Sequence, residues 1–217
     1  MACDLDWIIL RPSVGVGRPA YGGSALFRGL AALPVLPVMP DTGPLQIVQL
    51  EDVTDTVLFF LAPGAPARLT LDLAGPEALP LTEVVRTYRR WLGWAEPRII
   101  RLPAWVAGAL FHLGDAAGSL GWRPPLRSTA RREIARGAVG DPRAWSRLTG
   151  ITPQSLSASL ASEPASVQER WFAALYLLKP ILFSVLAAFW IVSGLLSIGP
   201  GYRIGVALMS EGGAGSP

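Results

Sequence analysis

The apolar and polar positions divide the chain into two regions with different patterns. Over most of the chain short apolar runs alternate with polar, proline-rich and glycine-rich segments, but residues 181–198 form one uninterrupted apolar run. This run contains eleven Ile, Leu, Phe and Val residues and no ionisable group. A helix of this length rises about 27 Å, close to the thickness of the hydrocarbon core of a bilayer, and it lies too late in the chain to be a signal peptide. The run therefore predicts a membrane helix, with a buried core helix as the alternative.

In the preceding region the pattern predicts strands that alternate with helices. Short apolar or alternating runs predict strands at residues 5–10, 45–50, 68–73 and 98–102. Helical spacing predicts helices at residues 24–32, 51–61, 80–93 and 128–138, a short helix opened by Thr152 and Pro153, and a long helix over 167–199. Residues 13–23 are predicted to form a loop, and Pro34, Pro37 and Pro40 to divide the next segment into extended pieces. This alternation is typical of an α/β fold.

The helix predicted at residues 80–93 has the clearest apolar face. Thr82 is available as its cap, and Gly93 as its end. The apolar residues that share one face of it are Val84, Val85, Tyr88, Trp91 and Leu92. Such a face is typical of a helix that packs on a core.

Composition and charge add one feature to this picture. Hydrophobic residues make up 51% of the chain and charged residues only 16%, which fits a globular core with a membrane segment. The net charge is +3, but arginines concentrate between residues 123 and 147, where only Glu133 and Asp141 oppose them. No motif that reads a nucleic-acid groove accompanies this cluster, so we expect no nucleic-acid partner. An anionic membrane surface and a solvated helix face are the two interpretations left open.

Few residues are available for catalytic or metal chemistry. Cys3 is the only cysteine and His112 the only histidine, so no metal-binding spacing exists and no metal site is expected. Gly15, Gly17 and Ala20 fit the spacing G-x-G-x-x-A of dinucleotide-binding turns. Pro12 lies between the strand and the first glycine, and Pro19 lies directly before Ala20. Both prolines argue against that turn. We expect a loop at the carboxyl end of a strand instead, where open α/β sheets bind ligands.

Several segments resemble a known family when they are taken in order. Residues 5–13 (LDWIILRPS), 47–53 (IVQLEDV), 73–77 (LAGPE) and 81–93 (LTEVVRTYRRWLG) resemble the second half of extended or atypical short-chain dehydrogenases/reductases. These are NAD(P)-binding proteins related to sugar epimerases. Two later segments, residues 122–142 and 169–195, resemble the C-terminal extension of a membrane-bound branch that carries a DoxX-like membrane segment.

The resemblance implies an α/β fold: a partial Rossmann-like domain followed by C-terminal α-helices that include one transmembrane helix. It divides the chain into a reductase-like half-domain at 1–102, an arginine-rich helical linker at 103–166, a truncated DoxX-like transmembrane segment at 167–201 and a disordered tail at 202–217. The glycine-rich turn of the family has no counterpart here. The family's catalytic Tyr-x-x-x-Lys is also absent, because the only lysine is Lys179 and Leu175 stands four residues before it. We therefore expect no catalytic residue and a truncated chain that is inactive alone.

The resemblance also implies where ligands would lie. Pro12, Ser13 and Val14 would line the nicotinamide side of an NAD(P) cofactor, and Gln49 would lie on the substrate side. An exposed strand residue at a sheet edge is the alternative for Gln49. Asp52 is expected to start a helix rather than to act as an acid.

The implied function is that of a membrane-anchored NAD(P)-dependent oxidoreductase or epimerase-like protein. The alternative is a non-enzymatic, membrane-tethered interaction module that completes its sheet with a partner chain, since an open half-sheet exposes an edge and invites aggregation. Arg170 and Lys179 precede the apolar run and only Arg203 follows it, so the expected location is the inner (cytoplasmic) membrane with the N-terminal part in the cytoplasm. Residues 103–122 either lie at the membrane interface or pack on the α/β core, and the pattern does not decide between the two.

Overall fold

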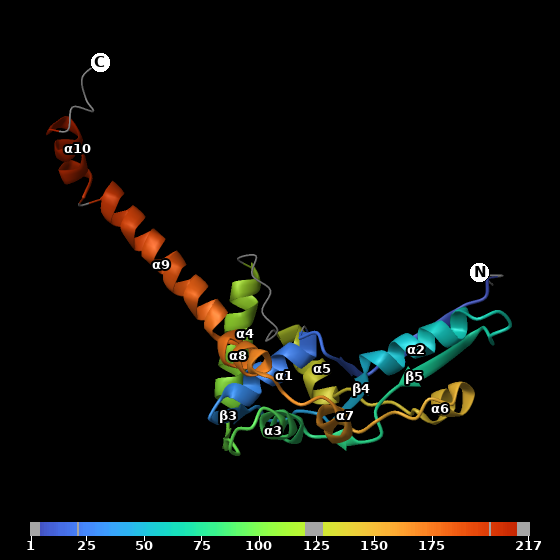
Figure 1. The fold of residues 1–217 in the computed structure, drawn as a ribbon. Coiled ribbons are helices and arrows are strands. Elements are labelled where there is room, and N and C mark those ends of the chain that lie inside the picture. The colour runs from blue at the N-terminus through green and yellow to red at the C-terminus, as the bar shows by residue number, and fades with distance from the viewer. Residues whose placement is uncertain (1–4, 21, 120–127, 200, 212–217) are drawn as a thin grey trace. The chain divides into compact units, whose positions relative to one another are not determined.

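The structure is a computed structural model that describes residues 5–20, 22–119, 128–199 and 201–211 (Figure 1). The predicted features at Trp122, the two arginines at 123 and 127, and the end of the tail lie outside these residues. The chain divides into two compact units, Met1–Ala174 and Leu175–Pro217, which are described separately below.

Small, mostly parallel sheets form the β structure of the first unit. β1 (Ile8–Pro12) pairs in parallel with β5 (Leu69–Leu73), and β3 (Val35–Val38) pairs in parallel with β7 (Arg98–Arg101). β4 (Leu45–Gln49) is the middle strand of a third sheet, between β2 (Val14–Val16) in parallel and β6 (Ala78–Leu79) in antiparallel. Strands and helices alternate along the chain, so the predicted α/β class is confirmed.

Eight described helices begin in the first unit, and the last of them extends two residues beyond its end at Ala174. They are α1 (Gly22–Ala32), α2 (Leu50–Leu61), α3 (Leu81–Trp91), α4 (Ala104–Ser119), α5 (Ser128–Arg136), α6 (Arg143–Thr149), α7 (Leu156–Ser162) and α8 (Val167–Tyr176). In the second unit, α9 (Leu178–Ile198) is followed by α10 (Tyr202–Glu211). Within α9, residues Ile181–Ile198 have a mean hydropathy of 2.4 and none of them is buried. Among the described helices, α9 is the one long and apolar enough to cross a membrane.

Two apolar clusters hold the first unit together. In the larger cluster, α3 packs its predicted face against α1 and the strands, with Val84, Val85, Tyr88 and Leu92 fully or almost fully buried. In the second cluster, Leu71 and Leu73 of β5 pack with Val48 and with Trp145 of α6. The face predicted for the helix at 80–93 is therefore confirmed.

Two buried polar side chains link the elements of this unit. Gln46 in β4 donates from Nε2 to the carbonyl of Gly75 (2.8 Å) and accepts from the Gly140 amide (2.7 Å). Arg89 of α3 donates from Nη1 to the carbonyls of Ala31 (2.6 Å) and Leu33 (2.8 Å), and its Nε donates to a third carbonyl beyond α3. Both side chains satisfy main-chain groups that the ends of elements leave without regular partners.

One loop prediction was wrong, and one helix was missed. The predicted loop at 13–23 contains strand β2, because Val14–Val16 finds a partner in β4, far away in the sequence. Helix α6 was not predicted, and it is held by the burial of Trp145 and by Gly150, whose φ of 75° ends it.

Three helix boundaries also differ from the prediction. The helix expected to open at Thr152 and Pro153 begins at Leu156, where the Ser155 hydroxyl accepts from the Ala158 amide (3.2 Å). α3 follows Pro80 without a side-chain cap, so Thr82 does not cap it. The predicted helix at 167–199 is two helices, because a proline three residues into α9 cannot donate to the carbonyl of Tyr176.

Candidate functional site

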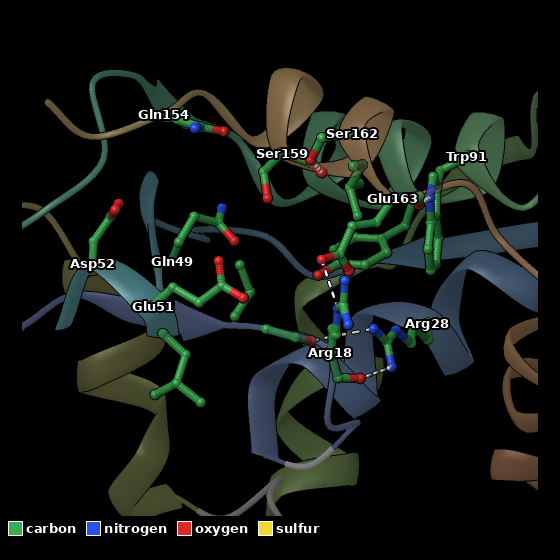
Figure 2. A pocket seen from close by; sticks show the side chains of 15 residues that line it. Arg18, Arg28, Gln49, Glu51, Asp52, Trp91, Gln154, Ser159, Ser162 and Glu163 are labelled. Atoms are coloured by element: carbon green, nitrogen blue, oxygen red, sulfur yellow. Dashed lines mark hydrogen bonds and ion pairs between the residues drawn. The ribbon is translucent and has the colours of Figure 1, made fainter. Parts of the chain in front are cut away.

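A pocket of about 130 Å³ lies in the first unit, where several elements meet (Figure 2). Its walls come from the segment after β2, the junction of β4 with α2, the buried faces of α1 and α3, and the segment around α7. The polar and aromatic residues that line it are Arg18, Arg28, Gln49, Glu51, Asp52, Tyr88, Trp91, Gln154, Ser159, Ser162 and Glu163. The pocket therefore lies at the carboxyl ends of two parallel strands, the usual place for ligands in α/β sheets.

Gln49 and Asp52 place unpaired polar atoms at the wall of this pocket. Gln49 ends β4 and stands at the N-cap of α2, and its Nε2 is buried without a hydrogen-bond partner. One carboxylate oxygen of Asp52, in the first turn of α2, is also buried without a partner. Burial raises the pKa of the Asp52 carboxyl, and the nearby charges of Asp55 and Glu51 raise it further. Buried polar groups without partners are rare, and such groups beside a pocket suit a polar ligand.

The arginines at the pocket are already engaged by the protein. Arg18 forms an ion pair with Glu163 (Nε to Oε1, 2.7 Å) across the pocket (Figure 2). Arg28 is buried and donates to the carbonyls of Gly17 and Arg18 (3.3 Å each), and its guanidinium lies 5.5 Å from the ring centroid of Trp91. Each guanidinium keeps further N–H donors, because the Arg18 side chain is 75% exposed and Nε of Arg28 is buried without a hydrogen-bond partner.

The other face of the pocket is aromatic. Trp91 donates from Nε1 to the carbonyl of Glu163 (2.6 Å), which joins α3 to the end of α7. Burial raises the pKa of Tyr88 to about 12, although the charge of Arg28 opposes the shift. Tyr88 therefore keeps its proton throughout the physiological range.

The structure brings one of the predicted site residues to this pocket. Gln49 lines it and its amide nitrogen is buried, although β4 is paired at this residue with β2 alone. Pro12 ends β1 and Val14 begins β2, and neither of them lines the pocket. Ser13 stands between the two strands, where its amide donates to the carbonyl of Leu73 (2.9 Å) and its hydroxyl is buried without a partner.

The described residues do not form a cradle for the pyrophosphate of a dinucleotide. Gly15 lies inside β2 rather than at a strand–helix turn, and α1 begins only at Gly22. A Cβ on Gly17 would lie 3.1 Å from Cβ of Leu50, so this loop packs against the start of α2. Nor does any group of three His, Cys, Asp or Glu residues that could hold a metal occur in the described part of the chain.

Most residues of the pocket could not be predicted from local sequence patterns. Arg28 could have been noticed, because it is the one charged residue of helix α1. Glu163 gave no local indication, because it meets Arg18 from 145 residues away. Arg11 pairs with Asp72 (2.9 Å), which lies opposite it in the β1–β5 register rather than nearby in the sequence.

Comparisons with known proteins agree with this fold. No family model matches the chain. The chain is 31% identical over 122 residues to a ceramide reductase from Caulobacter vibrioides (strain NA1000 / CB15N), an alignment that covers 55% of the chain and 37% of the reductase. Among solved structures, a nucleoside-diphosphate-sugar epimerase from Staphylococcus aureus superposes with a TM-score of 0.53 and 14% identity over 72% of this chain and 52% of the epimerase. A UDP-glucose 4-epimerase from Thermotoga maritima gives a TM-score of 0.44 and 13% identity over 82% of this chain and 47% of the epimerase.

The match to the Staphylococcus aureus epimerase shows that the chain shares an epimerase-like α/β fold over 72% of its length. The chain spans about a third of the length of the ceramide reductase and about half of the length of the two epimerases.

Proposed function

We propose that this chain supplies the substrate side of a membrane-anchored NAD(P)-dependent oxidoreductase or epimerase-like protein and catalyses no turnover by itself. The observation that supports this most is the pocket, where Gln49 and Asp52 present unpaired polar atoms within an epimerase-like fold. The sequence similarity to a reductase supports the same class of chemistry. NAD(P) enters the proposal through the family resemblance, because the described residues offer no pyrophosphate cradle.

The lack of turnover follows from the residues of the chain. Its single lysine, Lys179, stands in α9, in the second unit, and no tyrosine precedes it by four residues. A reductase of this family needs the tyrosine as acid and the lysine to lower the pKa of that tyrosine. Tyr88 does not replace it, because its pKa of about 12 leaves it a weak acid.

The charges around the pocket favour a neutral polar substrate. The lining residues include two arginines, both engaged within the protein, and three acidic residues, Glu51, Asp52 and Glu163. A diphosphate would meet these three carboxylates beside arginines whose charge is shared with Glu163 and with main-chain carbonyls, which disfavours it. A ceramide-like N-acyl amino alcohol or ketone would instead offer hydroxyl and carbonyl groups to Asp52 and to the Gln49 amide.

The test is ligand binding by the full chain in nanodiscs, measured by tryptophan fluorescence with Trp91 in the pocket wall. We expect saturable binding of a short-chain ceramide and no saturable binding of UDP-glucose, NADH or NADPH. Gln49→Leu should weaken ceramide binding about tenfold, the effect of one lost hydrogen bond. Gln168→Leu, an exposed glutamine of α8, is the matched control and should not change binding.

The outcomes separate the parts of this proposal. Reduction of a carbonyl compound by the purified chain with NADPH would refute the absence of turnover. Equal weakening by Gln49→Leu and Gln168→Leu, or no ceramide binding at all, would refute the proposed substrate site. Tighter binding of UDP-glucose than of ceramide would refute the preference for a neutral ligand.

For localisation, we propose that α9 crosses the inner membrane and that the first unit lies in the cytoplasm. The length and hydropathy of α9 support the crossing, and the positive residues before it, Arg170 and Lys179, support the orientation. The resemblance to a DoxX-like segment supports the same arrangement. Protease added to inverted membrane vesicles should digest the first unit, and protection of that unit would refute the orientation.

A tethered interaction module is the second candidate. Large apolar side chains remain exposed on and before β1 and on α2, including Trp7, Ile9, Leu58 and Leu61. A partner chain that extends the β1–β5 pair would cover such residues. This candidate predicts that Ile9→Lys reduces association of the full chain in sedimentation experiments while ceramide does not bind. Ceramide binding that depends on Gln49, with no effect of Ile9→Lys on association, would favour the first proposal.

A further inference from the structure

A second hollow, of about 350 Å³, lies between α4 and α5 in the first unit. It shares no lining residue with the pocket at Gln49 and Asp52. Its walls are the covered face of α4, one face of α5 and the turn at residues 39–41, which follows β3. The volume is more than twice the roughly 150 Å³ of a cavity that holds one benzene, and it lies in the range of small-molecule sites.

Most of the lining of this α4–α5 hollow is apolar. Ala107 and Phe111 reach it from α4, and both are buried. Ile134 and Ala135 reach it from α5, and Met39 reaches it from the turn after β3. An apolar group of a ligand that lies against these side chains is removed from water, which favours its binding.

Two arginines stand at the same hollow without partners in the described part of the chain. Arg131 and Arg132 line it from α5 and are exposed, and neither forms a hydrogen bond or an ion pair with a described residue. Asp41 is the one acidic residue among the described residues of the lining. The hollow therefore has a net positive charge, whereas the arginines at the Gln49 pocket share their charge with Glu163 and with main-chain carbonyls.

Hydrogen bonds to both ends of α5 hold this wall of the hollow in place. Near the carboxyl end, the Gly43 amide donates to the carbonyl of Ile134 (2.9 Å). At the other end, the Ser128 amide donates to the Asp115 carboxylate of α4 (3.1 Å). The helix that carries the arginines is thus fixed beside the hollow before a ligand binds, which reduces the entropy that binding must overcome.

The two kinds of lining residue together define the class of ligand. An arginine binds a carboxylate or a phosphate through two parallel N–H···O bonds. A small polar anion would leave the apolar walls in contact with water, and a neutral apolar molecule would make no use of the two guanidinium groups. A mostly apolar hollow with a few charged groups at one side suits a molecule that has an anionic head and an apolar body.

We propose that the α4–α5 hollow binds an anionic amphiphile, a molecule with one carboxylate or phosphate head and an apolar body. Arg131 and Arg132 would bind the head, and Phe111 and Ile134 would contact the apolar body. The site goes beyond the proposed function, because its residues and its ligand differ from those of the Gln49 pocket. It also does not depend on whether α9 crosses a membrane.

The test is isothermal titration of the full chain in nanodiscs of neutral lipid, with protein-free nanodiscs as the blank. The probes are octanoate, octyl phosphate, octanol and acetate. Octanol lacks the charge, and acetate lacks the apolar body. We expect saturable binding of octanoate or octyl phosphate at least about tenfold tighter than that of octanol and of acetate, and the tighter of the two anions identifies the head.

Two pairs of variants locate the binding. Arg131→Gln with Arg132→Gln should weaken binding of the tighter anion about tenfold, because the head loses its charged hydrogen-bond donors. The matched control is Arg98→Gln with Arg136→Gln, which removes the same charge from two exposed arginines outside the hollow and should leave binding unchanged.

The second pair tests the apolar body. Ala135→Leu fills the hollow from an exposed position of α5 and should also weaken binding about tenfold. Ala109→Leu, at an exposed position of α4 outside the hollow, should not change it. Both positions are exposed, so thermal unfolding should show that both variants keep the wild-type fold.

Four results would overturn the proposal. Octanol that binds as tightly as the anions would exclude recognition of the head, and acetate that binds as tightly would exclude recognition of the apolar body. Equal weakening by the two double arginine changes would show that only the net charge matters. Binding that Gln49→Leu weakens and Ala135→Leu does not would assign the amphiphile to the other pocket.

Discussion

Thr56 offers a sharp test of how α2 and the pocket beside it are held. Thr56 and Trp145 are both fully buried, and they come from α2 and α6. The Thr56 hydroxyl accepts a hydrogen bond from Nε1 of Trp145 (2.8 Å) and donates to the carbonyl of Asp52 (2.6 Å). Thr56→Val removes this hydroxyl but keeps the shape of the side chain.

The expected loss of stability follows from Trp145, the hydrogen-bond partner that remains. Thr56→Val leaves the buried indole N–H of Trp145 without an acceptor, and a buried donor without a partner costs about 1–3 kcal/mol. The main-chain hydrogen bonds of α2 do not change, so they contribute nothing to the difference. Each kcal/mol lowers the Tm of a protein of this size by about 2–4 °C. We therefore expect a decrease of about 2–12 °C.

The assay is urea and thermal unfolding of the full chain in nanodiscs, followed by near-ultraviolet circular dichroism of the tryptophans. Thr54→Val is the matched control, because Thr54 lies in the same helix, is exposed and makes the same kind of bond to a carbonyl four residues before it (2.9 Å). It should change the free energy of unfolding by less than about 0.5 kcal/mol. In a Trp145→Phe background, Thr56→Val should cost about 1 kcal/mol less than it does alone. Equal effects of Thr56→Val and Thr54→Val would refute this reasoning.

Three further changes test other parts of the first unit. Burial raises the pKa of Asp52 above its ordinary value of 3.8, so the folded chain loses stability as the pH rises through the raised pKa. In urea unfolding, Asp52→Asn should therefore be more stable than wild type at pH 7 and no more stable than wild type below pH 4. A greater stability of Asp52→Asn that persists below pH 4 would contradict the raised pKa. Arg89→Lys should cost about 2–4 kcal/mol because an ammonium cannot replace the buried guanidinium fork, whereas Arg90→Lys, at an exposed position, should cost less than about 1 kcal/mol in the same measurement. Gly75→Ala should cost at least about 2 kcal/mol or prevent folding, because its Cβ would collide with a main-chain carbonyl oxygen of β4. Gly15→Ala should be nearly neutral, because a Cβ there would meet open space. Equal thermal stability of the two variants would refute the close packing of Gly75 on β4.

The strands and helices that could be predicted are those whose pattern is local. The run at residues 45–50 became β4 and the alternating run at 68–73 became β5, because a strand places successive side chains on opposite faces of its sheet. α3 was predicted with its face because its buried residues repeat with the helical period. β2 was missed because three residues, one of them glycine, give no period, and only the pairing with β4 makes them a strand.

The candidate site was predictable only in part. Gln49 was singled out because it ends a predicted strand where a helix begins, and the structure places it at the pocket. Arg18 and Glu163 could not be paired in advance, because the contact depends on how α7 packs against α3, through the buried Leu156 among others. The pairing of Arg18 with Glu163, on which the proposed class of ligand depends, is thus a tertiary property.

The sequence by itself determined the α/β alternation, the buried face of α3 and the apolar segment of α9, because each follows from residues close together in the chain and from the period of one helix or strand. The tertiary structure alone decided which polar atoms remain unpaired beside a pocket and which face of α4 stays uncovered. Whether a buried polar atom finds a partner depends on all the segments that reach it in space, and around Gln49 and Asp52 those segments come from distant parts of the sequence.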